Sequence, residues 1–289
     1  MVTQILTHPG GAHKDELLAC SLLMAKHRVP VVRREPTEAD LADESGYVID
    51  VGGQHAPAQR NFDHHQFPRE FPPVCALSLV LQHLGLYEEA KRCCDWLETA
   101  EWFDARGPRA TAEWLGVERE ALGRLNSPLD VTLLRRFAAC EQLEPGEPLY
   151  EVLAMVGEDL LGYVEGMRDR VAALREQAEF WSIAPEEGDP FEVLFVPRSE
   201  PLPEEPGAGV GRFVEQAGKL EAVAGTVYAD RRGAGYALSR FNDDERLEFT
   251  RIAQEPDVHF AHARGFVAKT SATDPGRLRD LLAQSWRGR

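Results

Sequence analysis

The first 65 residues alternate apolar runs at 2–7, 29–32 and 47–51 with a helical pattern at 15–27. Strands that alternate with helices predict a parallel sheet, since parallel neighbours need a crossover connection. Such sheets bind their ligands outside the carboxyl ends of the strands. His8 and Asp50 each stand at such an end. The pattern therefore predicts an α/β domain in which distant segments deliver side chains to one crevice.

Histidine and aspartate gather in two short motifs near those strand ends. The stretch 8–15 contains two histidines and an aspartate, and the triplet 63–65 reads Asp-His-His. Each motif alone is explained by a turn or a helix cap, but their joint occurrence with Asp50 favours a metal site. Mixed imidazole and carboxylate ligands suit manganese, zinc or iron. Three histidines and three aspartates as ligands would exceed one tetrahedral ion and would suit two cations that share a carboxylate.

The rest of the chain predicts two domains, since 289 residues exceed the usual size of one. Helical patterns continue to a long amphipathic stretch at 149–181, and a turn-rich acidic segment follows at 184–190. Beyond it come four strand-like runs and a final helix near 277–286. We therefore expect an N-terminal domain at 1–184 and a smaller α+β domain at 190–289, joined by a linker at 184–190.

Composition limits the partners and the compartment. A net charge of −16 argues against coating long duplex nucleic acid, which requires many basic phosphate contacts. No apolar run reaches the roughly 18 residues that span a bilayer, so no membrane partner is expected. The five cysteines include no C-x-x-C pair and fit a reducing, cytoplasmic protein. We interpret them as small core residues.

The combined motifs resemble the DHH phosphoesterase superfamily, and most closely its melanocyte proliferating gene one family. The resemblance rests on residues 7–16, 50–53, 62–66 and 262–270. It implies a DHH-type domain with a parallel sheet flanked by helices, followed by a substrate-binding domain. It also implies two divalent cations, with manganese expected, and 3′-to-5′ exonuclease activity on short single-stranded RNA or DNA.

The resemblance implies a role for individual residues. One cation would be held by His8, His13 and Asp50, and the other by Asp15, Asp50, His64 and Asp104, with Asp50 bridging. His65 would contact phosphate or donate a proton to the leaving oxygen, and Asp63 would orient the neighbouring imidazoles. The second domain would grip the substrate through Arg240, His262, Gly265 and Lys269.

Two other functions remain open at this point. A small-molecule phosphohydrolase acting on a dinucleotide, polyphosphate or pyrophosphate would need only a compact cationic pocket, which suits an acidic chain. A nucleotide or metal sensor would keep the fold for binding alone. The sensor is disfavoured because each implied ligand position carries a residue that can coordinate.

Overall fold

The computed structural model describes residues 1–288 and divides into two compact units, Met1–Gly166 and a second unit that begins at Met167. Each unit contains one six-stranded sheet. Helix α8 (Pro148–Gln177) supplies residues to both units. No helix within these residues is long and apolar enough to span a membrane.

The sheet of the first unit has the strand order β4-β5-β3-β1-β2-β6. Its centre is parallel and consists of β5 (Asn61–Phe62), β3 (Gly46–Ile49), β1 (Gln4–Thr7) and β2 (Val31–Arg33). The edge strands β4 (His55–Ala56) and β6 (Gln142–Leu143) run antiparallel to their neighbours. The expected parallel sheet is thus present at the core and mixed at its edges.

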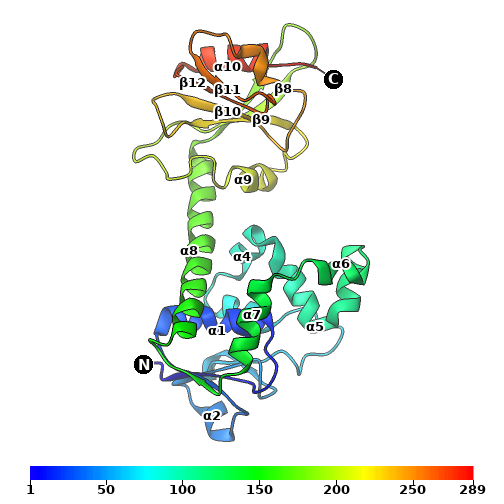
Figure 1. Cartoon of the computed structure of the whole chain (residues 1–289), viewed down its shortest axis with the longest axis vertical. Coiled ribbons are helices and arrows are strands. Elements are labelled where there is room, and N and C mark those ends of the chain that lie inside the picture. Colours follow the sequence, from blue (N-terminus) through cyan, green and yellow to red (C-terminus); the bar gives the residue numbers. More distant parts are fainter. Residues whose placement is uncertain (289) are drawn as a thin grey trace. The chain divides into compact units, whose positions relative to one another are not determined.

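Helices surround this sheet, and Figure 1 shows α1, α5 and α7 within the first unit. The helices are α1 (Lys14–His27), α2 (Glu38–Ala42), α3 (Ala76–His83), α4 (Tyr87–Cys93), α5 (Asp95–Leu115), α6 (Arg119–Arg124) and α7 (Pro128–Ala138), with a 3₁₀ turn, η1, at Pro57–Gln59. Helix α1 is buried along most of its length because Leu17, Leu22 and Met24 are enclosed in the core.

Helix α5 bends in its middle, at Gly107 and Pro108. Gly107 has φ 79° and ψ 167°, outside the helical region, and a proline cannot donate the backbone hydrogen bond of a continuing helix. The bend separates an N-terminal half, which carries Asp104, from a C-terminal half that ends at Leu115.

The second unit has the strand order β11-β12-β10-β9-β8-β7, and only β8 and β9 pair in parallel. The strands are β7 (Glu179–Ile183), β8 (Phe191–Phe195), β9 (Val223–Ala229), β10 (Tyr236–Arg240), β11 (Val258–Ala261) and β12 (Val267–Thr270). Helices α9 (Val210–Gln216) and α10 (Pro275–Gln284) and the 3₁₀ turn η2 (Phe249–Ile252) complete it. Val193 packs in the core that includes α10, whereas Leu194 packs in the core that includes α9. Alternate residues of a strand face opposite sides, so the two helices cover opposite faces of the sheet.

The segment 184–190, expected as a linker between domains, connects β7 to β8 instead. These strands are antiparallel neighbours with Ile183 opposite Phe191. The expected linker position is therefore wrong, and so is the expected extension of the helix to Trp181, because α8 ends at Gln177 and 179–183 is a strand. Gly and Pro mark hairpin loops as readily as linkers, so their presence did not distinguish the two.

Candidate metal centre

The parallel strands of the first unit deliver three of the expected residues to one edge of the sheet. His8 follows β1, Asp50 follows β3, and His64 lies two residues beyond β5. Asp50 adopts a left-handed backbone conformation with φ 59°, while its N–H donates to the carbonyl of Phe62. This turn at the end of β3 places the Asp50 carboxylate between segments that come from β1 and β5.

Three groups of potential ligand atoms share Asp50. One consists of His8, His13, Glu16 and Asp50, the second of Asp15, Asp50, His64 and Asp104, and the third of Asp50, His64 and His65. Within each group one ligand atom from every residue lies within 4.8 Å of the others. The structure therefore brings together all six residues expected to bind metal and adds Glu16 and His65 to them.

The shortest distances join carboxylates to imidazoles. Nε2 of His64 lies 2.7 Å from Oδ2 of Asp104 and 3.2 Å from Oδ1 of Asp50. Nε2 of His8 contacts Glu16 and lies 3.6 Å from Oδ2 of Asp50. His13 is the outermost member, with 61% of its side chain exposed and Nδ1 3.8 Å from Asp104.

The centre holds a high density of buried charge, which alters the pKa of its histidines. Contact with Glu16 raises the pKa of His8 to about 9 despite burial. Burial lowers the pKa of His64, but the carboxylates of Asp104 and Asp50 outweigh it and raise the value to about 10. Burial, with Asp50 and Asp104 nearby, raises the pKa of Asp15 well above its usual range. The clustered carboxylates of the centre therefore favour a positive charge close to them, on a protonated histidine or a bound cation.

Several buried polar atoms of the centre lack a hydrogen-bond partner. They are Oδ1 of Asp15, Oε2 of Glu16, both carboxylate oxygens of Asp50, Nε2 of His64 and Oδ2 of Asp104. The short distance between His64 and Asp104 is thus a charge contact outside hydrogen-bond alignment. Buried polar groups are normally paired, and carboxylate and imidazole atoms together form the donor set of manganese, zinc or iron. These residues fit divalent cations.

His65 is as exposed as His13, with 62% of its side chain accessible, but its ring is held by Asp63, a carboxylate outside the three groups. Its Nδ1 lies 2.7 Å from Oδ1 of Asp63, whose other oxygen accepts the N–H of Gly53 at 2.6 Å. Burial raises the pKa of Asp63, but hydrogen bonds from His65 and Gly53 prevail and lower it to about 2. Asp63 contacts His65 and not His64, so its carboxylate orients one of the two imidazoles.

Glu16 was missed from the sequence although it is completely buried in the first turn of α1. A glutamate beside Asp15 at a helix start is adequately explained by the helix dipole, which favours negative charge there. The available signal was its position directly before the apolar pair Leu17-Leu18, where a solvated acid is unexpected.

Comparison with known proteins gives a family for this segment. Residues 4–85 match the MYG1_exonuc family model, described as "Uncharacterised protein family (UPF0160)". The resemblance to the MYG1 family is confirmed over this segment. The chain is 43% identical to the MYG1 exonuclease of Rattus norvegicus over 67 residues, which is 22% of this chain and 17% of that protein. It is 41% identical to the MYG1 protein of Chlamydia muridarum over 84 residues, or 27% and 28% of the two chains. The matched segment thus spans less than a third of either relative.

The segment that matches the MYG1 family contains most residues of the centre but ends before Asp104. His8, His13, Asp15, Asp50 and His64 lie inside residues 4–85, while Asp104 and the whole second unit lie outside. Two solved structures also align over 98% of this chain: a pGpG-specific phosphodiesterase from Vibrio (13% identity, 97% of that chain, TM-score 0.32) and RecJ with Mn²⁺ from Thermus thermophilus (16%, 51%, 0.26). Similarity at these TM-scores assigns no fold.

The four residues expected to bind substrate belong to the second unit, and two of them are already paired. Nζ of Lys269 donates to Oδ1 of Asp230 at 2.7 Å. Arg240 donates to the Leu247 carbonyl at 2.6 Å and lies 3.3 Å from Glu248. Each side chain has further N–H donors, but its carboxylate partner competes with phosphate for the positive charge.

His262 and Gly265 form the turn between β11 and β12. The N–H of Gly265 donates to the carbonyl of His262, and the His262 ring lies 4.1 Å from that of Phe266. Gly265 has φ 69°, and a Cβ built on it would lie 1.8 Å from Oε1 of Glu248. The positive φ favours glycine, and a larger residue would also have to displace the carboxylate of Glu248, so this glycine has a structural reason that holds whatever the substrate.

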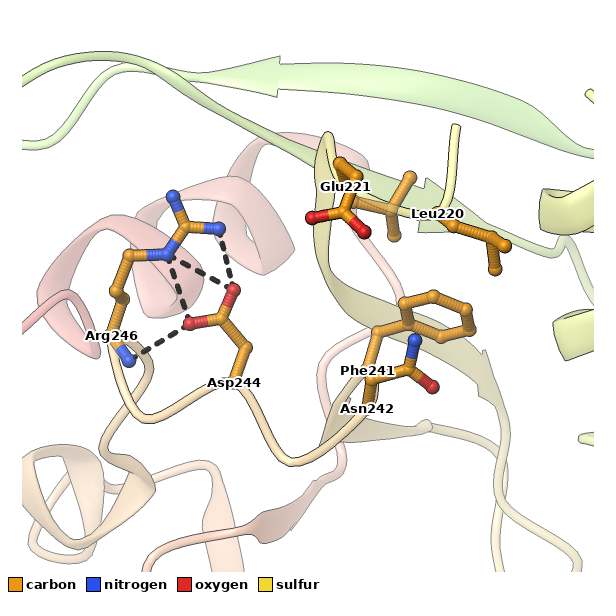
Figure 2. Close-up of a pocket in the computed structure, with 7 residues that line it drawn as sticks. Leu220, Glu221, Phe241, Asn242, Asp244 and Arg246 are labelled. Carbon is orange, nitrogen blue, oxygen red and sulfur yellow. Dashed lines mark hydrogen bonds and ion pairs between the residues drawn. The ribbon is translucent and has the colours of Figure 1, made fainter. Parts of the chain in front are cut away.

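The second unit also contains a cavity of about 370 Å³, which Figure 2 shows in close-up. Its lining residues are Leu220, Glu221, Val223, Phe241, Asn242, Asp244 and Arg246. Arg246 points to Asp244, and its Nε lies 2.9 and 3.0 Å from the two carboxylate oxygens. The guanidinium is therefore committed to Asp244, and the cavity contains none of the residues expected from the sequence.

Proposed function

We propose that this chain is a metal-dependent phosphoesterase that acts as a 3′-to-5′ exonuclease on short single-stranded RNA or DNA. The observation that carries the proposal is the convergence of buried carboxylates and imidazoles, with unpaired oxygen atoms, at the carboxyl edge of a parallel sheet. The similar protein from rat is an exonuclease by name, which supports the choice of a polymeric nucleic acid.

In this proposal His8, His13 and Asp50 hold one divalent cation, expected to be manganese. The second is held by Asp15, Asp50, His64 and Asp104, with Asp50 shared. Two such cations, when bound, offset the charge that develops on the phosphoryl oxygens and make an attacking water more acidic.

His65 is the proposed proton carrier. Because Asp63 accepts from Nδ1, the imidazole is held in the tautomer and orientation that leave Nε2 for the substrate. The His65 ring is exposed and can therefore contact the leaving oxygen of a substrate. The His64 ring is enclosed and cannot. The hydrogen bond with Asp63 raises the pKa of His65 and so favours the doubly protonated ring, whose Nε2 proton would pass to the leaving oxygen as the phosphodiester bond breaks.

Exposed aromatic rings near the ligand residues in the sequence favour a nucleotide substrate. Phe103, 49% exposed, directly precedes Asp104, and Phe71, 42% exposed, follows the DHH triplet in the chain. Arg106 links these segments by donating to the Phe71 carbonyl. Nucleobases stack on such rings with little dependence on sequence, which suits an exonuclease.

A small-molecule phosphohydrolase is the second candidate. It is favoured by the net charge of −16, since a dinucleotide, polyphosphate or pyrophosphate needs a local cationic pocket but no long basic groove. The two candidates share the metal centre and differ in what lies beside it.

Supplying manganese and comparing substrates separates them. Release of mononucleotides from 5′-labelled and 3′-labelled RNA and DNA is measured beside hydrolysis of pyrophosphate and cyclic dinucleotides. We expect stepwise release from 3′ ends and its loss in Asp50→Ala, which removes the shared ligand. Hydrolysis of pyrophosphate alone would reject the exonuclease, and full activity in Asp50→Ala would reject the proposed centre.

A further inference from the structure

We propose that Glu16 is an additional carboxylate ligand of the cation at His8 and His13, and that Arg33 is the residue that positions it. This inference rests on the proposed function, because it assigns a further ligand to the same centre. It also adds a residue from the end of β2, a strand to which the sequence assigned no role in the site.

The two oxygens of Glu16 have different surroundings. Oε1 accepts from Nη2 of Arg33 at 3.0 Å, in a pair whose side chains are 0% and 2% exposed. Oε2 contacts Nε2 of His8 but is left without a hydrogen-bond partner. The oxygen that faces the centre thus has an expected ligand histidine beside it but no aligned hydrogen bond, and such a buried carboxylate oxygen is costly unless a cation supplies the missing contact. Glu16 therefore directs Oε1 to the guanidinium of Arg33 and Oε2 to His8 in the centre.

Arg33 holds the loop between the two histidines as well as Glu16. Its Nη1 donates to the Phe137 carbonyl at 2.9 Å and to the Gly10 carbonyl at 3.3 Å, and its Nη2 donates to the Gly11 carbonyl at 3.3 Å. Its guanidinium lies 4.6 Å from the centre of the Phe137 ring. The planar fork of arginine makes these contacts together, whereas the single ammonium of lysine does not. One side chain therefore fixes Glu16 and the chain that carries His8 and His13.

The charges are consistent with Glu16 as a ligand. Asp15, Asp50 and Asp104 together carry three negative charges, and two divalent cations would leave the centre with one positive charge. Glu16 adds one negative charge and Arg33 removes it again. The centre thereby gains an oxygen ligand while its net charge, which attracts phosphate, stays the same.

Manganese binding to metal-free protein tests the assignment without measuring activity. Isothermal titration of wild type, Glu16→Gln and Asp104→Asn, with metal content measured after dialysis, reports the number and affinity of sites. We expect two manganese ions in wild type. Glu16→Gln keeps an oxygen for Arg33 but loses the charge, so one of the two sites should weaken at least tenfold while the other is unchanged. Asp104→Asn should weaken the other site.

Wild-type affinity at both sites in Glu16→Gln would overturn the assignment and leave a structural ion pair. If Glu16→Gln fails to fold by circular dichroism, Glu16→Asp decides, since it keeps the charge and withdraws the carboxylate by one methylene. Weakening of one site then supports the assignment, and unchanged affinity rejects it. A wild-type protein that binds no manganese would instead reject the proposed function itself.

The role of Arg33 is tested by Arg33→Lys, which keeps the charge and removes the fork. We expect the same site to weaken as in Glu16→Gln, and combining both changes should add little because they act on one ligand. Wild-type manganese affinity in Arg33→Lys would show that Arg33 positions nothing in the centre.

Discussion

His64 and Asp104 lie with Nε2 and Oδ2 only 2.7 Å apart, although one follows strand β5 and the other belongs to helix α5. The contact joins the segment that matches the MYG1 family to a helix outside that match. A complete centre therefore depends on how α5 folds against the sheet, and the bend at Gly107 lies one turn from Asp104.

Asp104→Asn should abolish most phosphodiester hydrolysis while retaining the fold. The amide keeps the size of the carboxylate but removes the charge that a cation at His64 would require. The measurement is kcat/KM on labelled oligonucleotide at saturating manganese, with circular dichroism as the folding control. Near wild-type kinetics would exclude Asp104 from the centre.

Manganese should raise the thermal stability of the protein, and chelation should lower it. A cation that binds only the folded state stabilises it by about 2.7 kcal/mol at a concentration 100 times its Kd, which is a shift of several degrees in Tm. Differential scanning calorimetry with manganese or EDTA measures the shift, and Asp50→Ala serves as the insensitive control. Equal Tm values for wild type in both conditions would contradict a metal centre.

Phe103→Ala should raise KM for single-stranded oligonucleotides, with a loss on the order of 1–3 kcal/mol for one stacked base. Hydrolysis of a phosphodiester without a nucleobase should be unaffected, because the ring does not alter the charges of the metal ligands. Phe103→Trp keeps an aromatic face and should retain affinity. Equal losses on both substrates would show that Phe103 supports the fold around Asp104 instead.

Lys269→Ala should lower kcat/KM while the metal content stays unchanged. The expected loss of transition-state stabilisation is about 1.5–3 kcal/mol, the contribution of one charged hydrogen bond to phosphate. The matched control is Asp230→Asn, which releases the ammonium from its partner at 2.7 Å. If Lys269 binds substrate, the control should keep or improve KM. If both variants lose only stability, Lys269 has a structural role.

Gly157→Ala should destabilise the protein strongly, because a Cβ there would lie 2.0 Å from the Ser21 carbonyl oxygen of α1. Overpacking of this kind typically costs about 1–3 kcal/mol. Gly162→Ala, in the same helix with open space around it, should stabilise by about 0.5–1 kcal/mol through helix propensity. Urea unfolding of both variants measures the contrast, and similar midpoints would refute it.

The sequence predicted those parts of the centre that strand order determines. His8 and Asp50 could be placed together because parallel strands end at one edge, whereas His64 was grouped with them through its Asp-His-His triplet, since the short strand β5 was not predicted. Asp104 required the family resemblance, since nothing local distinguishes it from other helical acids. Glu16 required the structure, because its burial depends on Arg33 at the end of a different strand. Likewise, 184–190 could not be recognised as a hairpin loop before β7 and β8 were known to pair.

Asp50 has a backbone role and a charge role at a single position. Its left-handed φ is tolerated better by aspartate and asparagine than by most other non-glycine residues. Its carboxylate lies near the acid of Asp15, but it also lies beside His8 and His64 and favours their charged forms. Asp50→Asn would keep the shape of the turn and change only the charge, and so would separate the two roles that this one residue combines.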